Sequence, residues 1–126
     1  MTKASYTTAI ALALTAWVAA PAAQAQTFMT EDEMLASLPG VQVNGTSQDG
    51  VAWAQAYSKR SGTKKDGIFN GVYGSDKYTG TWAIRNGQWC EETSDGWQGC
   101  FNFVRDGDKA LISYRDGKKQ GTWKIK

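Results

Sequence analysis

One carboxylate is predicted to lie where carboxylates are rare, on the apolar face of a β-sheet. Glu91 follows Trp89-Cys90 in a segment of alternating apolar and polar residues and falls in the apolar set, where strand pairing puts it beside Trp82. A buried carboxylate has a raised pKa, so Glu91 could hold a ligand or act as an acid. The alternative is a place near a barrel mouth, where Glu91 is hydrated or paired with an Arg or Lys. Glu91 and Trp82 are therefore candidate binding residues.

A basic loop at residues 58–67 is a second candidate. It contains glycine and carries four positive charges, on Lys59, Arg60, Lys64 and Lys65. Such a loop could contact an anionic surface, namely cell-wall polymer, lipid headgroups or an acidic protein. The alternative is a solvated turn that keeps a sheet edge soluble.

Aromatic residues supply a third candidate. Small barrels that bind hydrophobic ligands are often lined with aromatic side chains, and five of the six tryptophans lie beyond residue 25. A packed core of this size would use the same side chains, so both interpretations stay open.

Several kinds of chemistry lack the residues they need. The chain has no histidine, which removes the usual general base, the Ser-His-Asp and Cys-His arrangements, and the commonest transition-metal ligand. No glycine-rich phosphate loop joins a strand to a helix. We therefore expect a protein that is not an enzyme and has no metal or cofactor.

The first twenty-five residues are typical of an export signal. Lys3 precedes an apolar run at residues 9–20, Pro21 ends the run, and Ala23-Gln24-Ala25 predicts cleavage before Gln26. A run of this length is too short to span about 30 Å of hydrocarbon, so no transmembrane segment is expected. The predicted location is the periplasm or the extracellular medium.

Removal of residues 1–25, which carry only Lys3, leaves 13 basic and 12 acidic side chains. This balance predicts neither nucleic-acid nor anionic-membrane binding, which require a clear basic excess. Export also places both cysteines where disulfides persist.

Residues 26–40 are expected to form an N-terminal segment with one short helix. Thr30 and Glu33 have the spacing of a capping box, apolar residues follow at helical spacing, and Pro39-Gly40 ends the pattern. From residue 41 to residue 126 the period becomes that of strands, interrupted by turn residues.

Five turns can be closed from the sequence: Ser75-Asp76, Asn86-Gly87, Ser94-Asp95-Gly96, Asp106-Gly107 and Asp116-Gly117. The cross-strand pairs that follow include Ile84–Trp89, Trp89–Phe101, Cys90–Cys100, Glu91–Gly99, Tyr73–Tyr78, Phe103–Ala110 and Ile112–Gly121. Since a slip of one residue would exchange the two faces, the clustering of large apolar residues on one face supports the register.

That apolar face holds Phe69, Tyr73, Tyr78, Trp82, Ile84, Trp89, Phe101, Phe103, Ile112, Tyr114, Trp123 and Ile125. The polar face collects Thr79, Thr81, Arg85, Gln98, Asn102, Lys109, Ser113, Thr122 and Lys124. Two more strands are expected at residues 41–46 and 51–58, with Val51, Trp53 and Tyr57 facing inward. The fold class is therefore all-β: an antiparallel meander of about eight strands in a closed or nearly closed small barrel of lipocalin-like architecture.

Cys90 and Cys100 fall opposite each other on the polar face. Directly opposed residues in an antiparallel pair are close enough for a disulfide. We expect a structural disulfide, because the pair lacks the Cys-x-x-Cys spacing of redox-active thiols.

The residues from Tyr78 to Trp82, then Asn86 to Cys90 and the later Cys100, resemble a family of small exported bacterial proteins with a Gly-x-Trp, Trp-Cys and Cys core. The likeness covers residues 67–114, and the family has no established activity or catalytic residues to carry over. Gly80-x-Trp82 is also similar to the Gly-x-Trp of lipocalins, where that motif opens the first strand; here it lies mid-chain.

These observations predict a secreted or periplasmic, non-enzymatic binding domain that acts on an envelope component or a protein partner. The alternative is a carrier of a small apolar ligand in the barrel interior.

Overall fold

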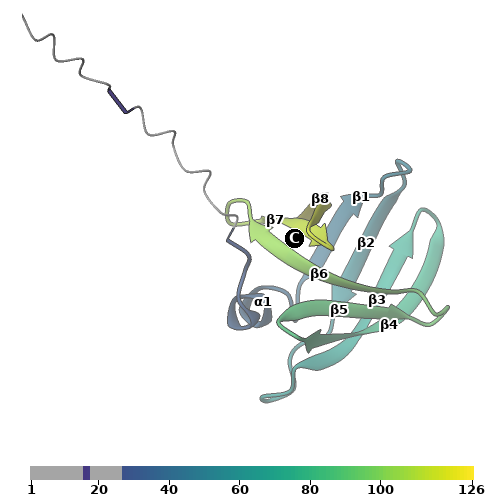
Figure 1. The fold of residues 1–126 in the computed structure, drawn as a ribbon. Helices are drawn as coiled ribbons and strands as arrows, with labels where there is room; N and C mark the ends of the chain where they lie inside the picture. The colour runs from purple at the N-terminus through teal and green to yellow at the C-terminus, as the bar shows by residue number, and fades with distance from the viewer. Residues whose placement is uncertain (1–15, 18–26) are drawn as a thin grey trace, which may run out of the picture.

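The chain folds into a closed antiparallel β-barrel preceded by one short helix, as Figure 1 shows. The computed structural model describes residues 16–17 and 27–126, so the predicted signal cleavage site lies outside the described residues. The elements are α1 (Glu31–Ser37), β1 (Gln42–Thr46), β2 (Ala52–Tyr57), β3 (Asp66–Tyr73), β4 (Asp76–Arg85), β5 (Gln88–Thr93), β6 (Gln98–Arg105), β7 (Ala110–Arg115) and β8 (Lys118–Ile125). The strands pair in sequence order and β1 pairs with β8, which confirms the predicted fold class.

Helix α1 covers one end of the barrel and begins at the predicted capping box. The Thr30 side chain accepts from the Glu33 backbone N–H, and the Glu33 side chain accepts from the Thr30 backbone N–H. Met34 and Leu38 are fully buried in the barrel core. We call this end, which also carries the Asn86-Gly87 turn, the closed end. The opposite end, with the 94–96 and 116–117 turns, is the open end.

Large side chains fill the half of the barrel next to α1. Trp82 and Trp89 stack with ring centroids 4.5 Å apart, and both are fully buried. Phe69, Phe103 and Leu111 are buried beside them in the same core. This packed half is what removes most of the apolar surface from water and holds the barrel closed.

The predicted register is confirmed around the central hairpins. Ile84 pairs with Trp89, and Trp89 pairs with Phe101. Asn86 and Gly87 have φ values of 51° and 72°, as a two-residue type I′ turn requires. Gly96 closes the next loop with a φ of 94°, the predicted left-handed position.

The prediction for β6 and β7 was wrong. The Asp106 N–H donates to the Ala110 carbonyl, which makes the loop longer than the predicted two-residue turn. Phe103 therefore pairs with Ser113 and not with Ala110, a shift of three residues. An odd shift exchanges the faces of a strand, so Ser113 points inward.

The exchange also moves three apolar residues of β7. Leu111 points inward and is fully buried, whereas Ile112 and Tyr114 lie on the outer face. There Tyr114 packs edge-to-face on Phe28, at 5.4 Å between ring centroids. Apolar residues occur in β7 at both odd and even positions. The alternation of apolar and polar residues therefore could not distinguish the two registers.

A bulge in the next hairpin restores the faces. Arg115 pairs with Lys118 as predicted, but the register shifts by one between Ser113 and Tyr114. Ile112 consequently pairs with Thr122 and not with Gly121. Since this second shift is also odd, it cancels the first, and Trp123 points inward as the sequence predicted.

The turn between β3 and β4 lies one residue earlier than predicted. Tyr73 pairs with Asp76 and not with Tyr78, and Gly74 takes the positive φ of the turn, 62°. The register moves by two residues, which leaves the faces unchanged. As a result Tyr78 lies opposite Gly71.

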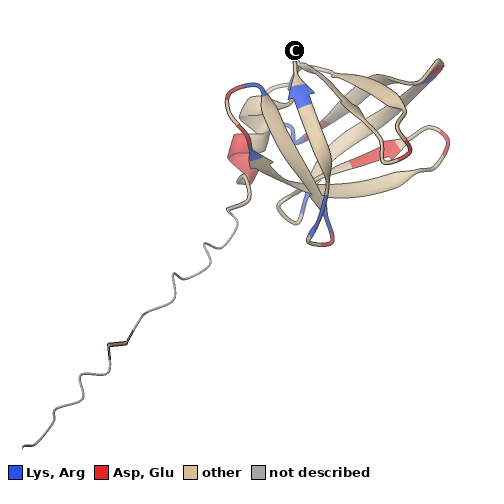
Figure 2. Cartoon of the chain, turned by 90° about the horizontal axis from the view of Figure 1, so that it is seen from above, with Lys and Arg blue, Asp and Glu red and all other residues tan. Residues whose placement is uncertain are grey.

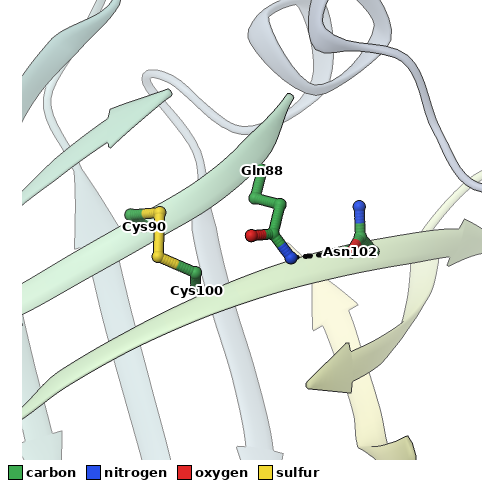
Figure 3. The surroundings of a disulfide bond; sticks show 4 residues. All are labelled: Gln88, Cys90, Cys100 and Asn102. Atoms are coloured by element: carbon green, nitrogen blue, oxygen red, sulfur yellow. Dashed lines mark hydrogen bonds between the residues drawn. A yellow bond between two sulfur atoms is a disulfide. The ribbon is translucent and has the colours of Figure 1, made fainter. Parts of the chain in front are cut away.

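The predicted disulfide joins Cys90 of β5 to Cys100 of β6, with Cα atoms 4.0 Å apart. Figure 3 shows it beside a second link between the same strands, in which the Gln88 side-chain amide donates to Asn102 Oδ1 at 2.8 Å. Both links lie on the outer face of this pair of strands, away from the barrel interior.

Candidate functional site

The open half of the barrel contains a cavity of about 710 Å³. Its walls include Trp53, Phe101, Trp123 and Tyr78, and its mouth includes Tyr73, Trp97, Arg115 and residues 46–49. Gly121 shows how much space is free: it pairs with the inward Ser113, yet a Cβ placed on it would meet nothing within 4 Å. The volume lies in the range of small-molecule sites, roughly 300–1,000 Å³.

A polar network forms the floor of this cavity, where the open half meets the packed half. Glu91 is 4% exposed and is held by two neutral donors. The Gln55 side-chain amide donates to its two carboxylate oxygens at 3.0 and 2.9 Å, and the Tyr57 hydroxyl donates to them at 3.2 and 3.1 Å. The carboxylate is thus fixed in position with its charge uncompensated by any cation among these contacts.

Tyr78 completes the network from β4. Its hydroxyl donates to the Gln55 Oε1 at 2.6 Å, while the Gln55 amide also donates to the Tyr57 hydroxyl at 2.7 Å. Tyr78 can lie in this position because Gly71 is opposite: a Cβ on Gly71 would approach the Tyr78 ring to 2.3 Å. Glycine is needed there for close approach and not for an unusual backbone conformation.

Burial changes the acidity of these groups. Removal from water raises the pKa of Glu91 from 4.5 to about 7, and the hydrogen bonds from Gln55, Tyr57 and Trp89 oppose that rise. Burial and the neighbouring Glu91 raise the pKa of Tyr57 well above its usual value, and raise the pKa of Tyr78 to about 12. Both phenols are therefore neutral donors at neutral pH, and Glu91 is the group of the network that titrates there.

Arg115 of β7 lies over the aromatic side chains near the mouth. Its guanidinium carbon is 5.4 Å from the centroid of the Trp97 ring and 5.7 Å from that of the Phe101 ring. Both distances are within the range of a cation–π contact. The aromatic wall thus already accommodates one positive charge.

Glu91 and Trp82 lie opposite each other in the β4–β5 pair, as the sequence predicted, but their side chains have different surroundings. Glu91 lines the cavity, but Trp82 belongs to the packed core of the closed half, stacked on Trp89. The alternative pairing of Glu91 with an Arg or Lys is not seen, since its hydrogen-bond partners are an amide and a phenol. The reason is depth: Glu91 lies below the aromatic wall, whereas Arg115 lies at the mouth above it.

The basic loop lies at the closed end, remote from the cavity, because it joins the end of β2 to the start of β3. Arg60 donates to the backbone carbonyls of Lys64 and Thr63 at 2.8 and 3.1 Å, and Lys65 forms an ion pair with Glu31 of α1. Lys59 is exposed. Lys and Arg residues lie at separate places around the barrel and not on one face, as Figure 2 shows.

The other members of the network are not marked as functional residues by the sequence pattern. Tyr57 and Tyr78 were predicted to face inward, but only as core residues, and Gln55 was not considered. Gln55 lies between Trp53 and Tyr57 at strand spacing, so its inward position was readable. What the sequence could not show is that Gln55, from β2, meets Glu91, from β5, across the barrel.

Two other features of the described residues lack the groups that would support chemistry. No cluster of three or more His, Cys, Asp or Glu within residues 16–17 and 27–126 is arranged to hold a metal ion. A second hollow of about 550 Å³ lies over β2 to β4 and is lined largely by outward-facing residues such as Ala54, Asn70 and Thr79. It has no buried charge comparable to Glu91.

Comparisons with protein-family models, with curated proteins and with solved structures find no match. The resemblance to small exported bacterial proteins therefore stays a prediction. No helix in the part of the chain that the structure describes has both the length and the apolar character of a membrane span.

Proposed function

We propose that this protein binds a small molecule inside the open half of its barrel. The observation that carries the proposal is a cavity of about 710 Å³ with aromatic walls and one buried carboxylate at its floor. A barrel that needed only a packed core could fill this half with side chains, as it fills the closed half. An unfilled half that also contains a costly buried carboxylate is typical of a binding site.

In this proposal the protein is a non-enzymatic carrier that acts after export. The disulfide between Cys90 and Cys100 supports an oxidising compartment, because such bonds are rare in the cytosol. The absence of histidine from the whole chain supports binding over catalysis.

Native mass spectrometry of the protein purified from its own host tests this function. We expect a fraction of the protein to carry an additional small-molecule mass that disappears on denaturation. The matched control is Gly121→Phe, which adds a ring to the cavity at a position where a Cβ meets nothing within 4 Å and leaves Glu91, Gln55 and Tyr57 in the chain. A clean unliganded mass for the unmodified protein, or the same extra mass on Gly121→Phe, would contradict the proposal.

Binding of an envelope component or a protein through the basic loop stays a prediction. Its support is weaker than that for the cavity, because Arg60 and Lys65 already make contacts within the chain. Lys59 and Lys64 would have to carry such binding.

A further inference from the structure

The hydrogen bonds at the cavity floor all run in one direction. Tyr78 donates to Gln55, Gln55 donates to Tyr57 and Glu91, and Tyr57 donates to Glu91. The hydroxyl hydrogens of both phenols and the two hydrogens of the Gln55 amide are consumed by these bonds. The network therefore ends on Glu91 and, when Glu91 is ionised, keeps no donor free for a ligand.

Acceptors, in contrast, remain available. A carboxylate has about four lone-pair sites, and Glu91 meets the Gln55 amide and the Tyr57 hydroxyl, with the Trp89 indole N–H as a weaker third donor, so at least one site remains. The Gln55 amide and the Tyr57 hydroxyl are each nearly equidistant from the two carboxylate oxygens, so both lie midway between these oxygens. The lone pairs on the far sides of the two oxygens are not used by these two donors. Tyr78 and Ser113 also donate elsewhere, the latter to the Gly121 carbonyl at 3.2 Å, which leaves their oxygens as acceptors in the cavity lining.

The walls and the exposed mouth of the cavity also favour positive charge. The residues that line the cavity include four carboxylates and two cations: Asp49, Asp76, Glu91, Asp95, Lys77 and Arg115. The faces of Trp53, Phe101 and Trp123 carry the negative side of the aromatic quadrupole, and Arg115 already lies over Phe101. Charge, aromatic walls and unused acceptors thus point to the same kind of ligand.

Resting on the proposed binding function, we infer that the ligand has a cationic, hydrogen-bond-donating head and an apolar body. A primary ammonium is the simplest such head: it donates to the unused lone pairs of Glu91 while the body lies against Trp53, Phe101 and Trp123. A carboxylate or phosphate head would meet Glu91 with like charge and with no donor to receive it. A neutral alcohol would pack against the same aromatic residues and could donate one hydrogen bond to Glu91, but it brings no positive charge to pair with the carboxylate.

Three probes that differ only in the head group test this inference: 4-phenylbutylammonium, 4-phenylbutanol and 4-phenylbutanoate. Isothermal titration calorimetry on the exported protein should show the ammonium binding at least roughly tenfold more tightly than the alcohol, and the carboxylate binding most weakly. In Glu91→Gln the ratio of ammonium to alcohol affinity should fall to near unity. In Gly121→Phe, which keeps Glu91 and its donors, binding of all three probes should weaken.

Equal or tighter binding of the alcohol or the carboxylate would overturn the head-group inference and leave the cavity as a binding site. A preference for the ammonium that survives in Glu91→Gln would overturn it as well, since the head would then lie elsewhere. Failure of all three probes would refute this ligand class, whereas the proposed function fails only if native mass spectrometry of the host protein also finds no ligand.

A measurement on the unmodified protein covers the case in which Glu91→Gln does not fold. With ¹³C-labelled glutamate, the carboxyl resonance of Glu91 should move clearly further on addition of the ammonium probe than on addition of the alcohol, because only the ammonium brings a positive charge to the carboxylate. Equal shifts with both probes, or no shift with the ammonium, would contradict contact between the head and Glu91.

Discussion

Glu91 combines features that rarely occur together in a residue with a purely structural role. It is 4% exposed, and the preceding inward residue of the same strand is the fully buried Trp89. Its hydrogen-bond donors are uncharged. Two neutral hydrogen bonds do not replace the hydration of a carboxylate, which is why burial dominates and its pKa is raised to about 7. The ionised form is therefore held at a cost to the folded state.

This cost predicts a pH dependence of stability. Between the unfolded pKa of 4.5 and the folded pKa of about 7, the folded protein binds more protons at Glu91 than the unfolded chain does. The contribution of Glu91 to the free energy of unfolding therefore falls as the pH rises through this interval and levels off above it. Glu91→Gln should lack this fall, and urea denaturation at about pH 5 and about pH 8 measures it as a difference between the two proteins.

The comparison is internally controlled, because every other titratable group is common to both proteins and cancels in the difference. Relative to the unmodified protein, Glu91→Gln should be more stable at the higher pH than at the lower. Parallel pH profiles would show that Glu91 ionises in the fold without penalty.

At the scale of the strands, cross-strand pairs of glycine with an aromatic residue shape the interior. Gly45 pairs with Trp53, Gly67 with Trp82, Gly80 with Phe69 and Gly71 with Tyr78, and in each pair a Cβ on the glycine would approach the ring within 3.0 Å. The missing side chain lets the ring lie against the opposite strand. Gly121 is an inward glycine without such a ring.

Gly71→Ala and Gly121→Ala form a matched pair that tests this distinction. Alanine at position 71 would displace the Tyr78 ring and its bond to Gln55, at an expected cost of roughly 1–3 kcal/mol in the free energy of unfolding. Alanine at position 121 would enter free space, and stability should stay within about 1 kcal/mol of the unmodified protein. Urea denaturation measures both, and equal losses would argue against an open cavity at Gly121.

The disulfide acts on the β5–β6 pair and not on the cavity. It closes a short loop between residues ten apart, and both cysteines point away from the interior. Cys90→Ala/Cys100→Ala should lower the free energy of unfolding by roughly 2–3 kcal/mol on the loop-entropy model. The affinity for the ammonium probe should not change, and a selective loss of binding at an intact fold would assign the bond a role in the site.

At the scale of the whole molecule, the two ends of the barrel are treated differently. Helix α1 covers the closed end and buries Met34 and Leu38 completely, whereas loops surround the open end without filling it. The buried core that stabilises the fold thus lies near the helix, and the entrance to the cavity lies near the turns of the opposite end. This division allows the open half to stay unfilled.

Leu38→Ala should therefore be costly even though it is far from the proposed site. Loss of a fully buried leucine destabilises by about 2–5 kcal/mol through lost burial and the cavity it leaves. The control is Ala36→Ser on the exposed side of α1, where a substitution should change stability by about 0.5 kcal/mol or less. Similar urea midpoints for the two variants would mean that α1 is not part of the cooperative core.

Part of the fold was readable from the chain alone. The capping box at Thr30, the Asn86-Gly87 turn and the opposed cysteines are local patterns, and local sterics and hydrogen bonding determine what they form. The errors in β7 have the opposite origin. This strand has apolar residues at both odd and even positions, and it is flanked by a longer loop and followed by a bulge. Its register is therefore determined by packing against the neighbouring strands.

The sequence by itself determined the meander, the helix, the disulfide and the inward place of Glu91, because each depends on spacing within one or two adjacent strands. Only the tertiary structure decided what surrounds Glu91. Gln55 and Tyr57 come from β2, which is not adjacent to β5 in the sheet, and they reach Glu91 only because the barrel closes and brings facing walls together. Closure also decides that one half is packed and the other hollow, since the volume enclosed depends on all eight strands at once.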